Sequence, residues 1–202
     1  MINSSEFQFV YCENGAQNEK FADSVRELLV LCDKEFIPPL SFRNSSTQKD
    51  FSGSSQSPNK ISGITLYLND LMKQNNIFVL DGENLIAFMS FKPNHFKFPF
   101  DTIIEPNEVN NYISTLIVHP KYRRFHIAYR LYDYIENLLN NDNMMACIST
   151  RTWSTNVSHI NLLKKRGYKF IYSAKNDRTD NEGNIVDTVY YLKYNYSEKN
   201  SD

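Results

Sequence analysis

Two adjacent arginines, Arg123 and Arg124, stand where an apolar segment ends and an amphipathic one begins, in the stretch VHPKYRRFHIAYRLY (118–132). The first amide N–H groups of a helix have no partners within the helix, and they attract anions. Guanidinium groups beside such amides add positive charge in a geometry that suits phosphate oxygens. The turn is therefore a candidate cradle for a pyrophosphate or a similar phosphate group, and the alternative is a solvated cationic face.

Two elements would hold this turn in place. The predicted strand NYISTLIVHP (111–120) leads into it and ends at Pro120, which has no N–H to donate to a ladder. The segment after the turn is predicted to be a helix with its apolar side chains on one face, at Ile127, Leu131, Tyr134, Ile135 and Leu138. The turn thus connects a strand to the N-terminus of a helix.

The chain continues with a predicted strand, MMACIST (144–150), and a short predicted helix, NVSHINLLKKRG (156–167). Asn156 is the candidate N-cap of that helix, and Gly167 is its candidate stop. Two closing strands, YKFIYSA (168–174) and TVYYLKY (188–194), follow with a polar segment between them.

The first half of the chain contains elements of the same kinds. Periodicity and turn residues predict a strand over 7–12, a helix over 18–36, a second helix over 61–74, and a hairpin over 76–92 that turns at Asp81-Gly82. A polar segment, 41–60, is predicted to be a mobile loop, and 93–110 is predicted to be a long excursion of the kind that lines sites. This order predicts a single α/β domain with a mixed sheet over 1–202, ending in a polar tail at 196–202.

Composition limits the partners of the protein. The chain has 202 residues and a net charge of −1, so it has no global basic field for nucleic acid or an anionic membrane. Three cysteines without CxxC spacing, at Cys12, Cys32 and Cys147, indicate reduced thiols and no metal site. No segment approaches the roughly 20 apolar residues that span a bilayer. A cytoplasmic protein is predicted.

The turn carries a resemblance. LIVHPKYRRFHIAYRLY resembles the acyl-CoA signature of the GNAT superfamily of N-acetyltransferases, [R/Q]-x-x-G-x-[G/A] after a strand, with Arg123, His126 and Ala128 at the marked positions. His126 departs from the usual glycine. A second block, NVSHINLLKKRGYKF, resembles N-x-x-A-x-x-L-Y-x-K-x-G-F of the same family, and there Leu163 stands where many members carry the tyrosine that protonates the leaving thiolate.

The resemblance implies a fold and a co-substrate. The fold would be α/β (α+β), GNAT-like, with a mixed, mostly antiparallel central sheet of six to seven strands flanked by about four helices. Acetyl-CoA would be the co-substrate. The residues implied to bind it are Ile117, Val118, Arg123, Arg124, Phe125, His126, Ile127, Ala128, Tyr129 and Asn156, with the N–H groups of Ile117 and Val118 near the thioester oxygen.

Acetyl transfer to an amine suggests catalytic candidates on the strand before the turn. Strict alternation would place Tyr112, Ser114, Leu116 and Val118 on one face, with Tyr112 and Ser114 toward the acceptor. An amine with a pKa near 10.4 must lose a proton, and Glu108 or Glu105 of the excursion could accept it directly or through water. Packing for Tyr112 and solvation for the two acids are the alternatives.

Two functional classes remain open. The first is an N-acetyltransferase that acetylates a primary amine of a small molecule or peptide by direct attack in a ternary complex. The second is a non-catalytic acyl-CoA-binding domain, which the replacement of tyrosine by Leu163 would fit. The aromatic and acidic excursion, with Asp101, Glu105 and Glu108, suggests a cationic acceptor. A homodimer is left open.

Overall fold

The computed structural model describes residues 7–13, 16–42, 63–105, 108–140, 146–180 and 182–194. One sheet is formed by seven strands, namely β1 (Gln8–Cys12), β2 (Asn75–Asp81), β3 (Asn84–Lys92), β4 (Val109–Val118), β5 (Ala146–Trp153), β6 (Lys169–Thr179) and β7 (Ile185–Tyr194). Their order across the sheet is β1-β2-β3-β4-β5-β7-β6; β4 and β5 run parallel, and the other neighbouring pairs run antiparallel. The predicted α/β class with a mixed, mostly antiparallel sheet is confirmed.

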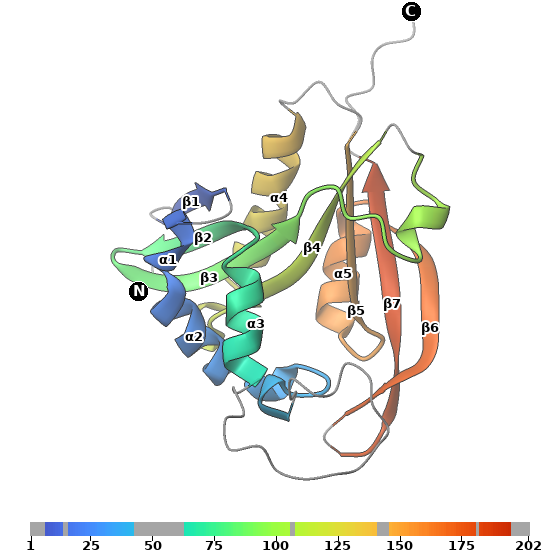
Figure 1. Cartoon of the computed structure of the whole chain (residues 1–202), viewed down its shortest axis with the longest axis horizontal. Coiled ribbons are helices and arrows are strands. Elements are labelled where there is room, and N and C mark those ends of the chain that lie inside the picture. The colour runs from blue at the N-terminus through green and yellow to red at the C-terminus, as the bar shows by residue number, and fades with distance from the viewer. Residues whose placement is uncertain are drawn as a thin grey trace, which may run out of the picture.

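Helices cover both faces of the sheet. The described residues form five α-helices, namely α1 (Ala16–Glu19), α2 (Ala22–Leu31), α3 (Gly63–Leu71), α4 (Ile127–Asn140) and α5 (Val157–Lys165). Figure 1 shows α2 and α3 on one face, and α4 behind the sheet on the other. Each face has its own core: Leu131 and Leu163 pack on one side, and Leu29 and Leu71 on the other. None of the helices in the described ranges is long and apolar enough to cross a membrane.

The two parallel strands pair over only part of their length. The register of β4 and β5 runs from Val109 opposite Ala146 to Ile113 opposite Thr150, although the strands continue to Val118 and Trp153. Beyond that point β4 stays paired with β3, and β5 stays paired with β7. The sheet therefore opens between β4 and β5, next to the turn that leads into α4.

A β-bulge lies where this opening begins. Ser90 of β3 pairs with Thr115 and Phe91 pairs with Ile113, so Ser114 is an extra residue in β4. The Ser114 hydroxyl lies 2.5 Å from Oε1 of Gln74 and 3.2 Å from the carbonyl oxygen of Ser90. The bulge is thus held by polar contacts to β3 and to the residue just before β2.

The bulge makes the prediction of one shared face wrong. Leu116 and Val118 pack against the core beneath α4, whereas Ile117 belongs to the core beneath α2 and α3. Tyr112 lies on the α3 side too, in a cluster with Phe100. One inserted residue reverses the alternation of every side chain that follows it.

The first half departs from prediction at one helix. The helix expected over 18–36 is interrupted, because the buried Asn18 side chain donates to the carbonyl oxygens of Met72 and Gln74 at 3.0 and 2.9 Å and α2 starts only at Ala22. After α2 ends, a 3-10 turn, η2 (Asp33–Glu35), follows. The side chain of Asn18 thus fixes a corner that apolar periodicity does not reveal.

The described residues include all of the predicted hairpin but only the first two residues of the predicted loop. Residues 41–42 belong to a 3-10 turn, η3 (Leu40–Phe42), while 43–60 and the tail 196–202 lie outside the described residues. The hairpin of β2 and β3 is confirmed, and Gly82 has the positive φ of 60° that such a turn requires. In the excursion, a turn named η4 (Phe100–Thr102) buries Phe100 to 1% exposure, so this segment builds core as well as surface.

Candidate functional site

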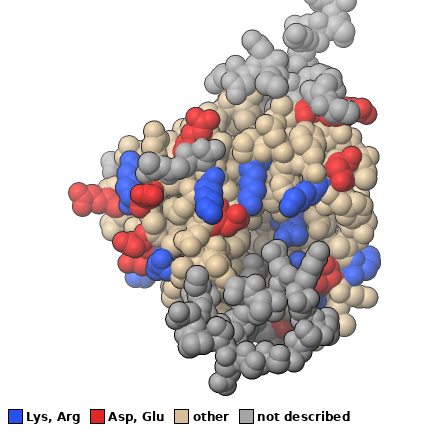
Figure 2. All heavy atoms as spheres, in the orientation of Figure 1, with Lys and Arg blue, Asp and Glu red and all other residues tan. Residues whose placement is uncertain are grey.

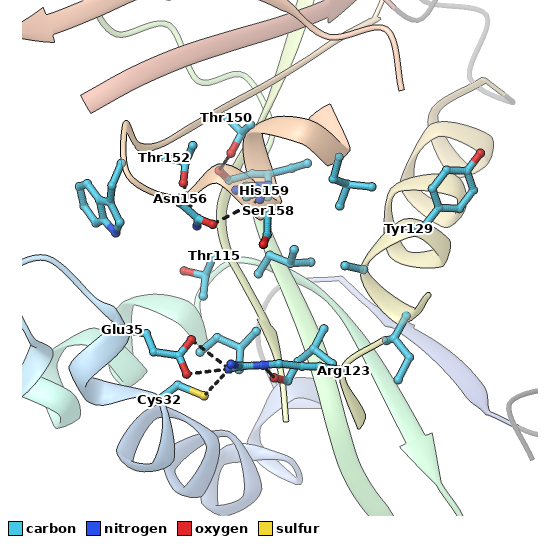
Figure 3. A pocket seen from close by; sticks show the side chains of 18 of the residues that line it. Cys32, Glu35, Thr115, Arg123, Tyr129, Thr150, Thr152, Asn156, Ser158 and His159 are labelled. Atoms are coloured by element: carbon cyan, nitrogen blue, oxygen red, sulfur yellow. Dashed lines mark hydrogen bonds and ion pairs between the residues drawn. The ribbon is translucent and has the colours of Figure 1, made fainter. Parts of the chain in front are cut away.

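A cavity of about 670 Å³ occupies the opening between β4 and β5. Its walls come from the diverging strands, the turn before α4, the first turns of α4 and α5, and the end of α2 with η2. Figure 3 shows Thr152 and His159 on one side of it, and Arg123 with Glu35 on the opposite side. Because its walls include residues from both faces of the sheet, the cavity borders both helical layers.

The turn that the sequence predicts to hold phosphate forms one end of this cavity. Arg124 and His126 have φ angles of 70° and 58°, the left-handed conformation that glycine favours. Left-handed residues among right-handed neighbours turn successive N–H groups into an anion-binding concavity. The N–H of Arg130 donates to the carbonyl of His126 at 3.0 Å, so the three amides before it have no acceptor within α4. The backbone therefore fits a pyrophosphate despite the histidine at the glycine position.

Most of the predicted cofactor residues line the cavity. Those on its wall are Ile117, Val118, Arg123, Arg124, His126, Ile127, Ala128, Tyr129 and Asn156. Phe125 instead packs against the core beneath α4. Ala128 presents only a methyl group at the helix start, which leaves the amides of this turn accessible to a bulky anion.

The two arginines of the turn have different surroundings. Nη2 of Arg123 donates to both carboxylate oxygens of Glu35, at 2.7 and 2.9 Å, and Nε of Arg123 lies 3.3 Å from the carbonyl oxygen of Val118. Arg123 therefore ties the end of β4 to η2. Arg124 is exposed and lines the cavity, and no ion pair of its guanidinium is found among the described residues. His119 Nδ1 accepts from the N–H of Lys121 at 3.1 Å, so this histidine supports the turn.

The edge of β4 supplies backbone groups to the opening. The N–H of His119 donates to Ile86 on β3, and N–H directions alternate along a strand. Ile117 therefore also directs its N–H toward β3, while Val118 and Leu116 direct theirs into the opening. The Val118 amide fits the predicted role near a thioester oxygen, and that of Ile117 does not.

The start of α5 forms the wall beside β5. Asn156 caps the helix as predicted, because its Oδ1 accepts from the N–H of His159 at 3.3 Å, and its amide also donates to Thr152 at 3.1 Å. His159 lines the cavity and lies 2.7 Å from the Tyr132 hydroxyl. Burial lowers the pKa of His159 to about 4, so this imidazole is neutral at pH 7.

Leu163 lies one turn farther along α5 and away from the cavity. Its side chain is 0% exposed and packs in the core beside Tyr168 and Leu131. Burial raises the pKa of Tyr132, and that of Tyr168 as well, so both phenols keep their protons. The position at which many family members carry a catalytic tyrosine is filled here by a packing residue.

The candidates for catalysis are not brought together. Ser114 lines the cavity, but Tyr112 and Glu108 do not. Glu108 lies just before β4, at the end remote from the opening, where its carboxylate accepts from the N–H of Glu105 at 3.0 Å. Asp101 and Glu105 are also absent from the cavity wall.

Arg151, which is not among the site residues predicted from the sequence, lines the cavity on the α3 side. Arg151 follows the last residue of β5 that pairs with β4, and it lies opposite Tyr190 of β7. Burial raises the pKa of Tyr112 to about 12, with the positive charge of Arg151 acting in the opposite direction. The strand predicted from the sequence ends at Thr150. Extending it to Trp153 would have placed the Arg151 side chain on the opposite face of the sheet from Thr150 and Thr152, because side chains alternate along a strand. Trp153 also lines the cavity.

The surface charge agrees with the balanced composition. Figure 2 shows acidic and basic side chains interspersed over the face with α2 and α3, without a continuous basic field. Positive charge at the cavity is local, at Arg124 and Arg151.

Comparisons with solved structures agree with this geometry. Arabidopsis thaliana NAA60 with a bisubstrate analogue is 13% identical, with a TM-score of 0.63 over 93% of this chain and 98% of that one. The ribosomal-protein-S18-alanine N-acetyltransferase of Escherichia coli is 11% identical, with a TM-score of 0.59 over 96% and 98%. Salmonella typhimurium yncA with acetyl-CoA is 9% identical, with a TM-score of 0.60 over 98% of both chains. At these identities the likeness shows the fold.

Sequence comparison identifies the family. No curated protein matches the chain. The model of the acetyltransferase (GNAT) family matches residues 44–168, more than half of the chain, including the first block that carried the resemblance and the second block up to Tyr168. Enzymes of this family use acetyl-CoA as co-substrate. The chain therefore belongs to the GNAT acetyltransferase family.

Proposed function

We propose that the protein is an N-acetyltransferase that transfers the acetyl group of acetyl-CoA to a primary amine of a small molecule or peptide in a ternary complex. The observation that carries this proposal is the placement of a backbone anion cradle at one end of a cavity that passes between two diverging strands. When bound, acetyl-CoA supplies a thioester whose carbonyl carbon the neutral amine attacks, and the carbon–sulfur bond then breaks to release CoA.

The residues of this chain divide the task of holding the co-substrate. Arg124 and the first amides of α4 would bind the pyrophosphate. The Asn156 amide, at the start of α5, would hydrogen-bond the pantetheine arm. The Val118 N–H, directed into the opening, would stabilise the developing negative charge on the thioester oxygen. None of these three roles requires a side-chain nucleophile.

Proton transfer rests on fewer groups. Tyr112 keeps its proton at neutral pH because burial raises its pKa to about 12, so it does not serve as the base. Ser114 is the one of the three sequence candidates on the cavity wall, and its hydroxyl contacts Gln74 and the carbonyl of Ser90. We keep Ser114 as the candidate that contacts the reacting groups, and we expect water in the cavity to accept the proton.

Calorimetry and a turnover assay together test the proposal. Wild-type protein should bind acetyl-CoA and CoA with micromolar affinity, and Arg124→Ala should weaken both by about tenfold because it removes a charge-assisted contact to phosphate. A thiol-detecting assay over a library of primary amines should then detect release of CoA. Absence of acetyl-CoA binding would overturn the proposal, whereas binding without release from any amine would favour the non-catalytic acyl-CoA-binding domain.

A further inference from the structure

The charged side chains on the cavity wall leave one arginine without an assigned role. They are Glu35, Arg123, Arg124 and Arg151. Glu35 and Arg123 neutralise one another in their ion pair. Arg124 belongs to the turn before α4, where the proposed function uses its charge for phosphate. Arg151 lies on another strand, β5, and nothing in the cofactor cradle accounts for its positive charge.

Strand geometry places Arg151 on the side of the opening away from α5. Thr152 accepts a hydrogen bond from Asn156 at the start of α5, and Ile148, two residues before Thr150, packs in the core beneath α4. Side chains alternate along β5, so Arg151 projects to the opposite face. There it meets Tyr112 and Tyr190, whose rings belong to the cluster on the α3 side. Arg151 thus lines the cavity where it borders the α2–α3 layer.

The neighbours of this guanidinium do not neutralise its charge. Tyr190 of β7 lies opposite Arg151, Tyr112 lies near enough for the positive charge of Arg151 to act on it, and Tyr112 is an uncharged phenol at neutral pH. Asp177 acts on Arg151 at longer range, but its carboxylate contacts the Thr188 hydroxyl at 2.5 Å and Arg178 at 3.1 Å. Within the described ranges no carboxylate forms an ion pair with Arg151. An exposed arginine without an ion pair among the described residues is suited to an anionic ligand group.

Aromatic rings continue outward from this arginine. Tyr190 contacts Tyr172 with ring centroids 5.8 Å apart, and Tyr172 contacts Phe98 at 4.9 Å. Phe98 is 59% exposed, so the outer end of this row faces solvent. A ligand anchored at Arg151 therefore has an aromatic surface on which an apolar part can lie.

We infer that Arg151 binds a carboxylate of the acceptor, so that the preferred acceptors are primary amines that also carry a carboxylate, such as amino acids. The inference rests on the proposed function and names its substrate class. It replaces the cationic acceptor suggested by the sequence, because Asp101, Glu105 and Glu108 do not line the cavity whereas Arg151 does. A planar carboxylate suits the two parallel N–H groups of a guanidinium.

Paired amines test this specificity by turnover. Each pair differs by one carboxylate: phenylalanine with phenethylamine, 4-aminobutyrate with propylamine, and lysine with cadaverine. We expect CoA release to favour the acid of at least one pair by about tenfold or more in kcat/KM, mainly through KM, as loss of a charged hydrogen bond costs in specificity. Arg151→Gln should remove this preference, and Arg151→Lys should restore part of it. Arg26→Gln, which removes the same charge from α2 outside the cavity, should leave it intact.

Binding separates this inference from the proposed function. Calorimetric titration of the same pairs into CoA-loaded protein does not require turnover, and the acid of a pair should bind about tenfold tighter to wild type than to Arg151→Gln. Equal binding and equal turnover of acid and amine in every pair would overturn the inference while leaving the acetyltransferase intact. Tight, Arg151-dependent binding of the acids without CoA release would support the carboxylate site and count against the enzyme.

Discussion

The two sides of the opening between β4 and β5 differ in the groups that they offer to a ligand, which are backbone groups on one side and side chains on the other. On the side of α4, the anion cradle consists of backbone: left-handed φ angles at Arg124 and His126, and helix amides that have no partners within α4. On the side of α3, the wall consists of side chains, with Arg151 near Tyr112 of β4 and opposite Tyr190 of β7. A backbone cradle tolerates changes of side chain, whereas a side-chain wall changes its ligand with each substitution.

This difference explains how one fold can keep a co-substrate and vary an acceptor. The cradle needs a turn geometry, the charge of Arg124 and a small residue at Ala128, and these requirements lie within a few consecutive residues. We call the α3 side of the cavity, with Arg151 and the neighbouring Tyr112 and Tyr190, the acceptor wall because it is the surface proposed to contact the acceptor. It needs side chains from β4, β5 and β7 to meet, so a single substitution on any of these strands can change its charge. The comparison makes the following variants informative.

The largest effect should come from filling the cradle. Ala128→Glu places a carboxylate at the first amides of α4, where it occupies the space of a phosphate and repels its charge. Acetyl-CoA affinity should fall by about a hundredfold or more, or about 2.7 kcal/mol. Calorimetry measures the loss, with Ala128→Ser as the control that adds one small hydroxyl. Retained affinity in Ala128→Glu would place the co-substrate elsewhere.

A second variant tests whether the buried face of α5 serves packing or chemistry. Leu163→Tyr puts a phenol at a fully buried position, and the larger ring should lower the free energy of unfolding by about 1–3 kcal/mol through overpacking. Denaturant unfolding measures this cost. Val157→Tyr, at a position 61% exposed on the same helix, should cost much less. A gain in CoA release by Leu163→Tyr would show that the missing tyrosine limits catalysis.

The cradle could be predicted from sequence because its determinants are contiguous. Strand, arginines, helix start and the Asn156 cap all follow from local patterns, and the structure confirms the cap and the strand-to-helix turn. The acceptor wall could not, because two long-range features decide it. The bulge at Ser114 reverses the alternation along β4, and β5 extends three residues past its predicted end to include Arg151. Both depend on pairing with strands that are distant in sequence.

The buried histidine beside the cavity should make stability depend on pH. Burial lowers the pKa of His159 to about 4, so between its unfolded pKa near 6.5 and pH 4 the unfolded chain binds more protons than the folded one. Stability should therefore be highest above pH 6.5 and fall as the pH drops toward 4, by at most about 1.4 kcal/mol per pH unit for one proton.

Two histidine variants test whether His159 causes this pH dependence of stability. His159→Gln should flatten it, although burial also lowers the pKa of His95 and leaves some slope in the same direction. His119→Gln, which changes a histidine that accepts a backbone hydrogen bond outside the cavity wall, serves as the control. Denaturant unfolding at several pH values measures the slopes. An unchanged slope in His159→Gln would mean that the imidazole protonates in the folded protein.

The smallest effect should come from His126, one of the two left-handed residues of the cradle. It tests most directly whether the cradle is formed by backbone groups. His126 has a φ of 58°, which costs a non-glycine residue about 1–2 kcal/mol, while glycine loses about 0.5–1 kcal/mol more entropy on folding. His126→Gly should therefore raise the free energy of unfolding by no more than about 1 kcal/mol. Acetyl-CoA affinity should stay the same or improve, because the amides that bind phosphate belong to the backbone. His126→Val, with a branched side chain in the same conformation, should lower stability instead. A large loss of affinity in His126→Gly would mean that the imidazole itself binds the anion, and the cradle would then depend on side chains as the acceptor wall does.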